Sequence, residues 1–171
     1  MQQKVTTYLW FNNNAETAIN FYVDVFNNAP FKTSESKVLS ISHYPEGPLE
    51  GPMAGLEGMV SNGVFTLAGQ QFIAFDGGPQ FKFTEAISLF VECQNQEEVD
   101  YYWEKLSAVP EAEACGWLKD KFGLSWQIIP TKLGELVGSS DTEKAARAMH
   151  AMLQMKKIDI AGLQRAFHGE E

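Results

Sequence analysis

Basic residues and cysteine are both scarce in this sequence. It holds 13 lysines and arginines against 22 aspartates and glutamates, so its formal net charge is −9. This balance argues against a nucleic-acid partner, because binding to phosphates needs a surface rich in lysine and arginine. The two cysteines, Cys93 and Cys115, are too few for a disulfide framework. We interpret them as reduced thiols of a cytoplasmic protein.

Long apolar runs are also missing. A transmembrane helix needs about 18 or more consecutive apolar residues, and the chain has no such stretch. The first residues, MQQKVTTYLWF, enter a strand pattern directly, without the charged and apolar regions of a signal peptide. We therefore expect no membrane partner.

The stretch Ala86–Leu106 has the pattern of a strand that runs into a helix. Apolar and polar residues alternate over residues 87–92, as in a strand with a buried face. Asn95 is followed three residues later by Glu98, a capping box that signals the start of a helix. Apolar residues then recur at helical spacing, at Val99, Tyr102, Trp103 and Leu106.

The same strand–helix unit occurs earlier, in Thr6–Phe26. Without any gap, Leu9 aligns with Leu89 and Tyr22 with Tyr102. A predicted hairpin follows each helix, with a glycine at its tip. The first turns at Ala68-Gly69. The second joins Glu113–Lys121 to Leu124–Pro130 at Phe122-Gly123.

A half-exposed strand over Ser34–Tyr44 completes the first half. Each half is then a β-α-β-β-β module, the third element of the second module being short, and the fold class is α+β. We expect three regions within one structural domain, residues 1–79, 80–137 and 138–171. The last is a helical tail, with a capping box at Ser140 and Glu143 and a second helix capped by Asp159. Its apolar stripe includes Ala145, Met149, Met152, Leu153, Leu163 and Phe167. This stripe must pack on the same subunit or on a partner.

Several segments resemble a known family. They are FYVDVF at the end of the first helix, DGGP at residues 76–79, FKFTEAISLFVECQNQEEVDYYWEKL, CGWLKDKFGLSWQIIP and AARAMHAMLQMKKIDIAGL. Together they are similar to the PhnB-like proteins, a branch of the vicinal oxygen chelate superfamily that is often called 3-demethylubiquinone-9 3-methyltransferase-like. The superfamily includes glyoxalase I, extradiol dioxygenases and bleomycin-resistance proteins. One departure is Asp76, where the family pattern has asparagine.

The resemblance implies curved sheets around a cleft between the modules, a small-molecule ligand and a homodimer. In the glyoxalase-like members, the first and last strands of each module supply the metal ligands. Alignment on the first helix places the first of these positions at Thr7, and the last-strand position of the second module falls on Gln127. The offsets between the two modules, 80 residues for the first strands and 54 for the hairpins, add Ile87 and Ile73. None is His, Asp, Glu or Cys, the side chains that hold transition metals. We therefore expect no metal and no cofactor, although a metal-dependent glyoxalase- or dioxygenase-type enzyme remains the alternative.

The preferred hypothesis is a protein that binds a small, partly apolar molecule in the cleft between the modules. The candidate ligand-binding residues are Thr7, Phe11, His43, Ile73, Phe75, Ile87 and Gln127. Strand alternation puts Phe11 on the same side as Thr7. His43 ends a strand beside the Pro/Gly-rich loop at residues 45–58, although solvated or packed histidines are commoner than functional ones. No catalytic residue is assigned, and whether the protein is an enzyme stays open.

A methyltransferase, which the family label suggests, needs a cofactor site. FIAFDGGP, Phe72–Pro79, is superficially like the glycine-rich loop that follows a strand in nucleotide-binding proteins. Such a loop must open a helix whose amides meet the ligand, and the following PQFKF has no helical period. We interpret it as a tight turn between modules. Cys115, on the predicted strand with Lys119 and Lys121, is interpreted as an apolar filler.

Overall fold

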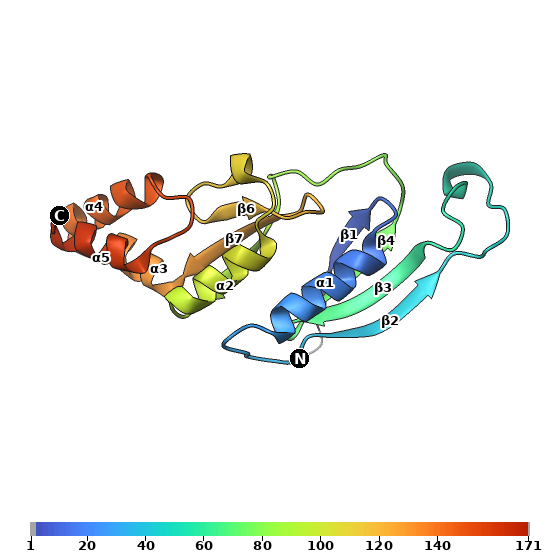
Figure 1. Ribbon diagram of the computed structural model, residues 1–171, viewed down its shortest axis with the longest axis horizontal. Coiled ribbons are helices and arrows are strands. Elements are labelled where there is room, and N and C mark those ends of the chain that lie inside the picture. Colours follow the sequence, from blue (N-terminus) through green and yellow to red (C-terminus); the bar gives the residue numbers. More distant parts are fainter. Residues whose placement is uncertain (1–2, 171) are drawn as a thin grey trace. The chain divides into compact units, whose positions relative to one another are not determined.

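The structure is a computed structural model that describes residues 3–170. Between Phe83 and Thr84 the chain divides into two compact units, each with its own β-sheet (Figure 1). We call them the N-terminal unit and the C-terminal unit. The architecture is α+β, as predicted.

The N-terminal unit is the predicted β-α-β-β-β module. Its elements are β1 (Thr7–Phe11), α1 (Ala15–Asn27), β2 (Lys37–His43), the short 3₁₀ helix η1 (Gly51–Met53), β3 (Val60–Leu67) and β4 (Gln70–Asp76). The four strands form sheet A in the order β1-β4-β3-β2, with β1 parallel to β4 and the other pairs antiparallel. The helix α1 lies along this sheet (Figure 1). The predicted order of elements in the first module is thus confirmed.

Strand alternation produces the core beneath α1. Leu9 and Phe11 are buried, as are Ile19 and Tyr22 of the helix. Gly63 of β3 leaves room for this contact, since a Cβ there would lie 2.5 Å from Cδ1 of Ile19. A side chain at this position of β3 would force the end of the Ile19 side chain to shift.

The predicted turn at Ala68-Gly69 is confirmed. Both residues have positive φ, 47° and 85°, the geometry of the type I′ turns that suit the twist of a hairpin. Ser36, which is buried just before β2, accepts a hydrogen bond from the backbone N of Ala68 at 2.9 Å. This hydrogen bond joins the tip of the β3–β4 hairpin to the start of the edge strand β2.

The C-terminal unit contains a shorter module and three further helices. Its elements are β5 (Ser88–Cys93), α2 (Gln96–Leu106), the 3₁₀ helix η2 (Pro110–Ala112), β6 (Trp117–Lys119), β7 (Ser125–Pro130), α3 (Thr131–Val137), α4 (Thr142–Leu153) and α5 (Ile160–His168). Sheet B has the order β5-β7-β6, with β5 parallel to β7 and β6 antiparallel to it. The short third element predicted for this module is replaced by η2.

The predicted strand at Glu113–Lys121 is wrong over its first half. Cys115 and Gly116 both have positive φ, 51° and 85°, and form a two-residue turn that brings Ala114 to Trp117. Only Trp117–Lys119 remains as strand β6. Cys115 therefore lies at a turn and not on a strand, and β-propensity at these positions was overridden by the turn.

Capping was predicted well for α2 and less well for the tail. Asn95 accepts a hydrogen bond from the N of Glu98 at 3.1 Å, and Glu98 accepts one from the N of Gln94 at 2.7 Å. In contrast, α4 is capped by Asp141, one residue beyond the predicted Ser140. The last helix starts after Asp159, as predicted.

The tail forms a hydrophobic cluster within the C-terminal unit. Its buried members are Leu133, Leu136, Ala148, Ile158 and Leu163, and Ile129 of β7 packs against them. The helix α3, which the sequence did not predict, contributes the first two. On α4 the buried residue is Ala148, whereas Met149 and Leu153 of the predicted stripe are exposed.

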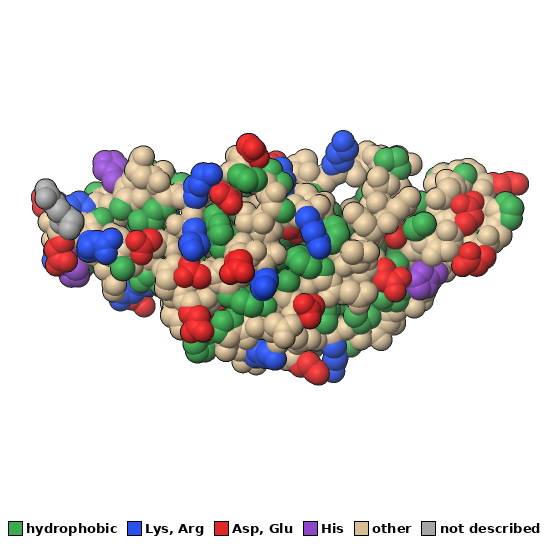
Figure 2. Space-filling model, viewed as in Figure 1, with side chains coloured by type: hydrophobic (Ala, Val, Ile, Leu, Met, Phe, Trp, Pro, Cys, Tyr) green, Lys and Arg blue, Asp and Glu red, His purple; other side chains and the backbone are tan. Residues whose placement is uncertain are grey.

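The surface carries mixed charge. On the face seen in Figure 2, acidic and basic side chains are interspersed over both units. No helix among residues 3–170 has both the length and the apolar character needed to cross a membrane.

Candidate functional site

The face of sheet A opposite α1, which we call the open face of sheet A, carries a row of aromatic rings. Tyr8 and Trp10 alternate with the buried residues of β1 and lie in register with Ile73 and Phe75 of β4. The ring of Phe75 packs edge-to-face on Tyr8 at 5.1 Å and on Trp10 at 4.8 Å, between centroids. Phe81 extends the row, 4.9 Å from Trp10. Tyr8 is 52% exposed and Phe81 65% exposed, so both ends of the row are accessible.

The glycine-rich loop after β4 is built around Trp10. A Cβ at Gly77 would lie 2.4 Å from the indole ring, and the indole N–H donates to the carbonyl of Gly78 at 2.9 Å. Residues 77–87 contain no helix. The loop is a turn, as predicted, and lacks the helix N-terminus with which glycine-rich loops bind nucleotide-type cofactors.

Asp76, at the start of this loop, has a structural role. Its buried carboxylate accepts hydrogen bonds from the backbone N atoms of Asn14 at 2.9 Å, Ala15 at 3.0 Å and Val60 at 3.1 Å. Two of these donors belong to the start of α1, which the carboxylate therefore caps through a tertiary contact. The third joins the start of β3 to the end of β4.

The face of sheet B opposite the buried residues Val91 and Ile128, which we call the open face of sheet B, carries two rows of side chains. One row contains Ser88, Ser125 and Lys119, which lie in register across β5, β7 and β6. The next row, two residues along, contains Phe90, Gln127 and Trp117. The two rows are joined by a hydrogen bond of 2.9 Å from the side-chain amide of Gln127 to Oγ of Ser88.

The predicted ligand-binding residues do not all share one face. Phe11 is buried beneath α1, and Thr7 lies in register with the buried Phe72. Ile73 and Phe75 lie on the opposite, open face. A ligand on one face of sheet A cannot contact all four residues, so the predicted set divides between the two faces of this sheet.

The remaining predicted residues are spread over both units. Ile87 precedes β5 and is largely exposed, while Gln127 lies on the open face of sheet B. His43 ends β2, and its Nε2 lies 3.0 Å from a carboxylate oxygen of Glu16. His43 therefore joins the end of β2 to the first turn of α1 through a polar contact at the surface.

The predicted metal-ligand positions of the first strands, Thr7 and Ile87, are each followed by a residue on the open face. These residues are Tyr8, in register with Ile73, and Ser88, which accepts a hydrogen bond from Gln127. A phenol, a hydroxyl and an amide do not make the nitrogen, thiolate and carboxylate set that a transition metal needs. Residues 3–170 contain no group of three or more His, Cys, Asp and Glu side chains that could hold a metal ion.

Four residues of the open faces were not among the predicted ligand-binding residues: Tyr8, Trp10, Ser88 and Lys119. The alternation that identifies each strand also divides its side chains into two sets. Which set lies beneath the helix depends on how the helix packs, and Thr7 and Phe11 belong to the set on the helix side of sheet A.

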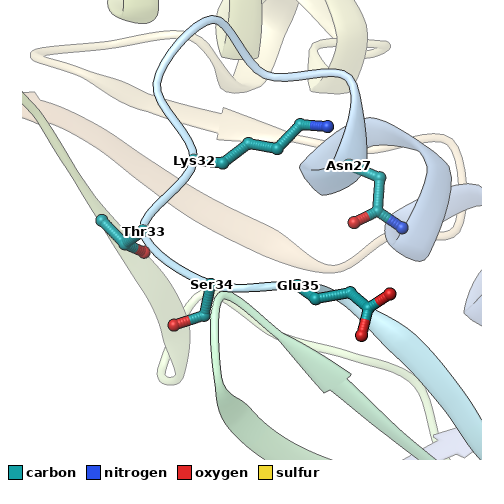
Figure 3. A pocket seen from close by; sticks show the side chains of 5 residues that line it. All are labelled: Asn27, Lys32, Thr33, Ser34 and Glu35. Atoms are coloured by element: carbon teal, nitrogen blue, oxygen red, sulfur yellow. The ribbon is translucent and has the colours of Figure 1, made fainter.

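A cavity of about 440 Å³ lies beside the end of α1 (Figure 3). It is lined by Asn27, Lys32, Thr33, Ser34 and Glu35. The side chain of Asn27 is already occupied, donating to the carbonyl of Ser36 at 2.6 Å and accepting from its N at 3.0 Å. The labelled side chains of Thr33, Ser34 and Glu35 diverge from the loop instead of converging on one point (Figure 3). This cavity therefore lacks the arrangement of a binding site.

The family model for 3-demethylubiquinone-9 3-methyltransferase matches residues 3–129. The chain belongs to this family. The family is a branch of the vicinal oxygen chelate superfamily, as the resemblance implied. No curated protein matches the chain. The match ends before α3, so the helical tail lies outside the family's conserved model.

Solved structures agree with this assignment. The PhnB protein from Bacillus cereus is 39% identical, and the alignment covers 75% of this chain and all of that protein, with a TM-score of 0.59. Protein PA1353 from Pseudomonas aeruginosa is 18% identical over 75% of this chain and 98% of its own, with a TM-score of 0.53. The second similarity shows a shared fold alone.

We expect only one of the two thiols to react rapidly in the native protein. Burial, with the nearby carboxylates of Glu98 and Glu92, raises the pKa of the Cys93 thiol to about 12, so its reactive thiolate is scarce at pH 8. Cys115 is partly exposed at its turn. Titration with a chromogenic disulfide at pH 8 should give one fast thiol per chain before denaturation and two after it. The Cys115→Ser variant should show no fast thiol, and fast reaction of Cys93 in that folded variant would contradict the expectation.

Proposed function

We propose that this protein binds a small, partly apolar molecule on the open faces of its sheets and uses no metal or cofactor to do so. The observation that carries the proposal is the aromatic row of sheet A. Tyr8, Phe75, Trp10 and Phe81 hold one another edge-to-face, which fixes their orientation before any ligand arrives. Preorganised rings with exposed edges and faces suit an apolar ligand with a few polar groups.

The two rival functions have less support. A glyoxalase- or dioxygenase-type enzyme needs a divalent metal, and the side chains at the open-face positions are poor ligands for one. A methyltransferase needs a site for its methyl donor, and the glycine-rich loop that most resembles such a site packs around Trp10. We also propose that the protein is a homodimer, as the resemblance implied.

The proposal is tested with 2-naphthol, a neutral and partly apolar probe. We expect saturable shifts of amide resonances in β1 and β4, measured by ¹H–¹⁵N NMR on the intact chain. Replacement of both Tyr8 and Phe81 by alanine should weaken binding about tenfold, since each aromatic contact contributes about 0.5–1.5 kcal/mol. Phe31→Ala, which truncates an exposed ring outside the row, is the matched control and should leave affinity unchanged.

Metal dependence and assembly are measured on the same preparation. After dialysis we expect far less than one transition metal ion per chain by elemental analysis, and EDTA should not alter binding of 2-naphthol. Native mass spectrometry reports the subunit number and any small molecule that co-purifies. A stoichiometric metal whose removal abolishes binding, or equal affinity in the double variant and the parent, would overturn the proposal.

A further inference from the structure

The polar row on sheet B contains a lysine that is mostly removed from water. The side chain of Lys119 is only 24% exposed, and on the edge strand β6 it lies in register with the uncharged Ser125 of β7. Withdrawing an ammonium group from water is costly unless an anion accompanies it. The position therefore favours a negatively charged partner.

Glu85 supplies that partner from outside the sheet. Its carboxylate forms an ion pair with the Lys119 ammonium, and the hydrogen bond from Lys119 is the main reason that the pKa of Glu85 lies below its usual value. Glu85 belongs to the irregular segment before β5, and its own side chain is 61% exposed. Exposed carboxylates contribute little to ion pairs, because water competes for them. Another carboxylate can thus replace Glu85 at Lys119 at small cost.

A second observation, independent of Lys119, indicates a missing ligand atom. Ser125 lies between Lys119 and Ser88 in the same row and is only 1% exposed. Among residues 3–170, the hydroxyl of Ser125 has no hydrogen-bond partner. A buried hydroxyl without a partner costs about 1–3 kcal/mol. A ligand oxygen held by Lys119 could accept a hydrogen bond from Ser125.

The neighbouring row provides an apolar surface. Phe90, which is exposed, and Trp117 flank Gln127, and this row lies two residues from the polar one along each strand. Two residues of a strand span about 6.6–6.8 Å, a distance that a small molecule with a charged end and an apolar body can bridge. Along the strands of sheet B, a polar row is thus followed by an apolar one.

We propose that the open face of sheet B binds the carboxylate of a small, partly apolar acid at Ser88, Ser125 and Lys119, with its apolar body against Phe90 and Trp117. Glu85 occupies Lys119 in the free protein and is displaced by the ligand. This inference rests on the proposed function and adds the chemical class of the ligand, a small acid with an apolar body.

The test uses phenylacetate, its neutral isostere phenylacetamide and inorganic phosphate as probes of the intact ¹⁵N-labelled chain. We expect saturable shifts of the amides of Ser88, Lys119 and Ser125 with phenylacetate. Affinity for phenylacetamide should be about tenfold lower or worse, because it cannot make the charge-assisted bond. Phosphate should bind more weakly than phenylacetate, since it lacks the apolar body. Phosphate binding as tight as that of phenylacetate would overturn the role of the aromatic row.

Two variants with opposite expected effects separate the parts of the proposal. Lys119→Met should weaken phenylacetate binding about tenfold or more, whereas Glu85→Gln should strengthen it severalfold by freeing the ammonium group. Lys105→Met, which removes an exposed lysine of α2, is the control and should change nothing. Equal affinities for phenylacetate and phenylacetamide, or weaker binding in Glu85→Gln, would overturn the carboxylate site even if Lys119→Met fails to fold. Binding of 2-naphthol to sheet A without any response of sheet B to phenylacetate would defeat this inference and leave the proposed function standing, while failure of both probes would defeat both.

Discussion

Replacement of Asp76 by alanine should destabilise the N-terminal unit by about 3–5 kcal/mol, because three backbone donors at buried or partly buried positions lose their acceptor together. These donors are the N atoms of Asn14, Ala15 and Val60, each within 3.1 Å of the carboxylate. The loss affects the start of α1 and the β3–β4 pairing at once. Urea unfolding followed by circular dichroism, with amide hydrogen exchange to locate the change, measures the effect.

The conservative variant Asp76→Asn is the sharper test. Asparagine has one acceptor oxygen, and the carboxylate uses two: one oxygen accepts from Asn14 and Ala15, and the other from Val60. Whichever way the amide is turned, its NH₂ group faces at least one backbone donor. We expect a loss of about 1–3 kcal/mol, the cost of an unpaired buried polar group. A neutral result would show that α1 can be capped in another way.

Asp24→Asn is the matched control for this substitution. Asp24 lies on the exposed side of α1, so its replacement by asparagine makes the same change of charge without the loss of a buried contact. Its effect should stay within about 0.5 kcal/mol, as for most surface substitutions. Equal effects at Asp76 and Asp24 would mean that net charge, and not capping, accounts for the change.

Replacement of Leu163 by alanine should cost the C-terminal unit about 2–5 kcal/mol, the range for a fully buried leucine that leaves a cavity. Leu163 is fully buried in the tail cluster with Leu133, Leu136, Ala148 and Ile158. The tail is also joined to the module by its backbone, since the N atoms of Cys115 and Gly116 donate to the carbonyls of Met155 and Lys156 at 2.8 Å. Loosening the cluster should therefore weaken sheet B as well. Urea unfolding, with amide exchange in β6 and β7, measures both effects.

Leu153→Ala is the matched control, because it removes the same atoms from a side chain that is 53% exposed. We expect at most about 0.5 kcal/mol of destabilisation in the monomer. If Leu153→Ala instead dissociates a dimer, the exposed residues of α4 contact a partner. A loss for Leu163→Ala no larger than for Leu153→Ala would show that the tail cluster contributes little to the stability of this unit.

Much of the fold could be predicted because its signals are local. The repeat of strand and helix, the hairpin at Ala68-Gly69 and the start of α2 all follow from residues close together in the sequence. The second hairpin was harder to predict, because Cys115 adopts a positive φ and its backbone N donates to the carbonyl of Met155 in the tail. This contact is distant in the sequence. The helix α3 was missed because it begins directly after β7 without a polar capping residue.

The candidate site divides along the same line. Alternation in β1 and β5 was evident from the residues, and so was the shortage of metal ligands. Alternation is symmetric, however, and does not say whether Leu9 and Phe11 or Tyr8 and Trp10 lie beneath the helix. That choice follows from packing, since Leu9 and Phe11 are buried together with Ile19 and Tyr22 of α1, whereas Tyr8 is exposed. The pairing of Lys119 with Ser125 likewise depends on the register of β6 with β7.

The two equivalent helices differ in where their capping groups come from. The start of α2 was determined by the sequence, because Asn95 and Glu98 cap it within four residues of one another. The start of α1 was decided by the tertiary structure, because its cap is Asp76, 62 residues beyond Asn14 in the chain. A local contact can form whenever the helix forms, so its residues can be recognised in the sequence. A cap from a distant strand exists only once sheet A has formed, so the residues around Asn14 do not indicate that Asp76 caps this helix.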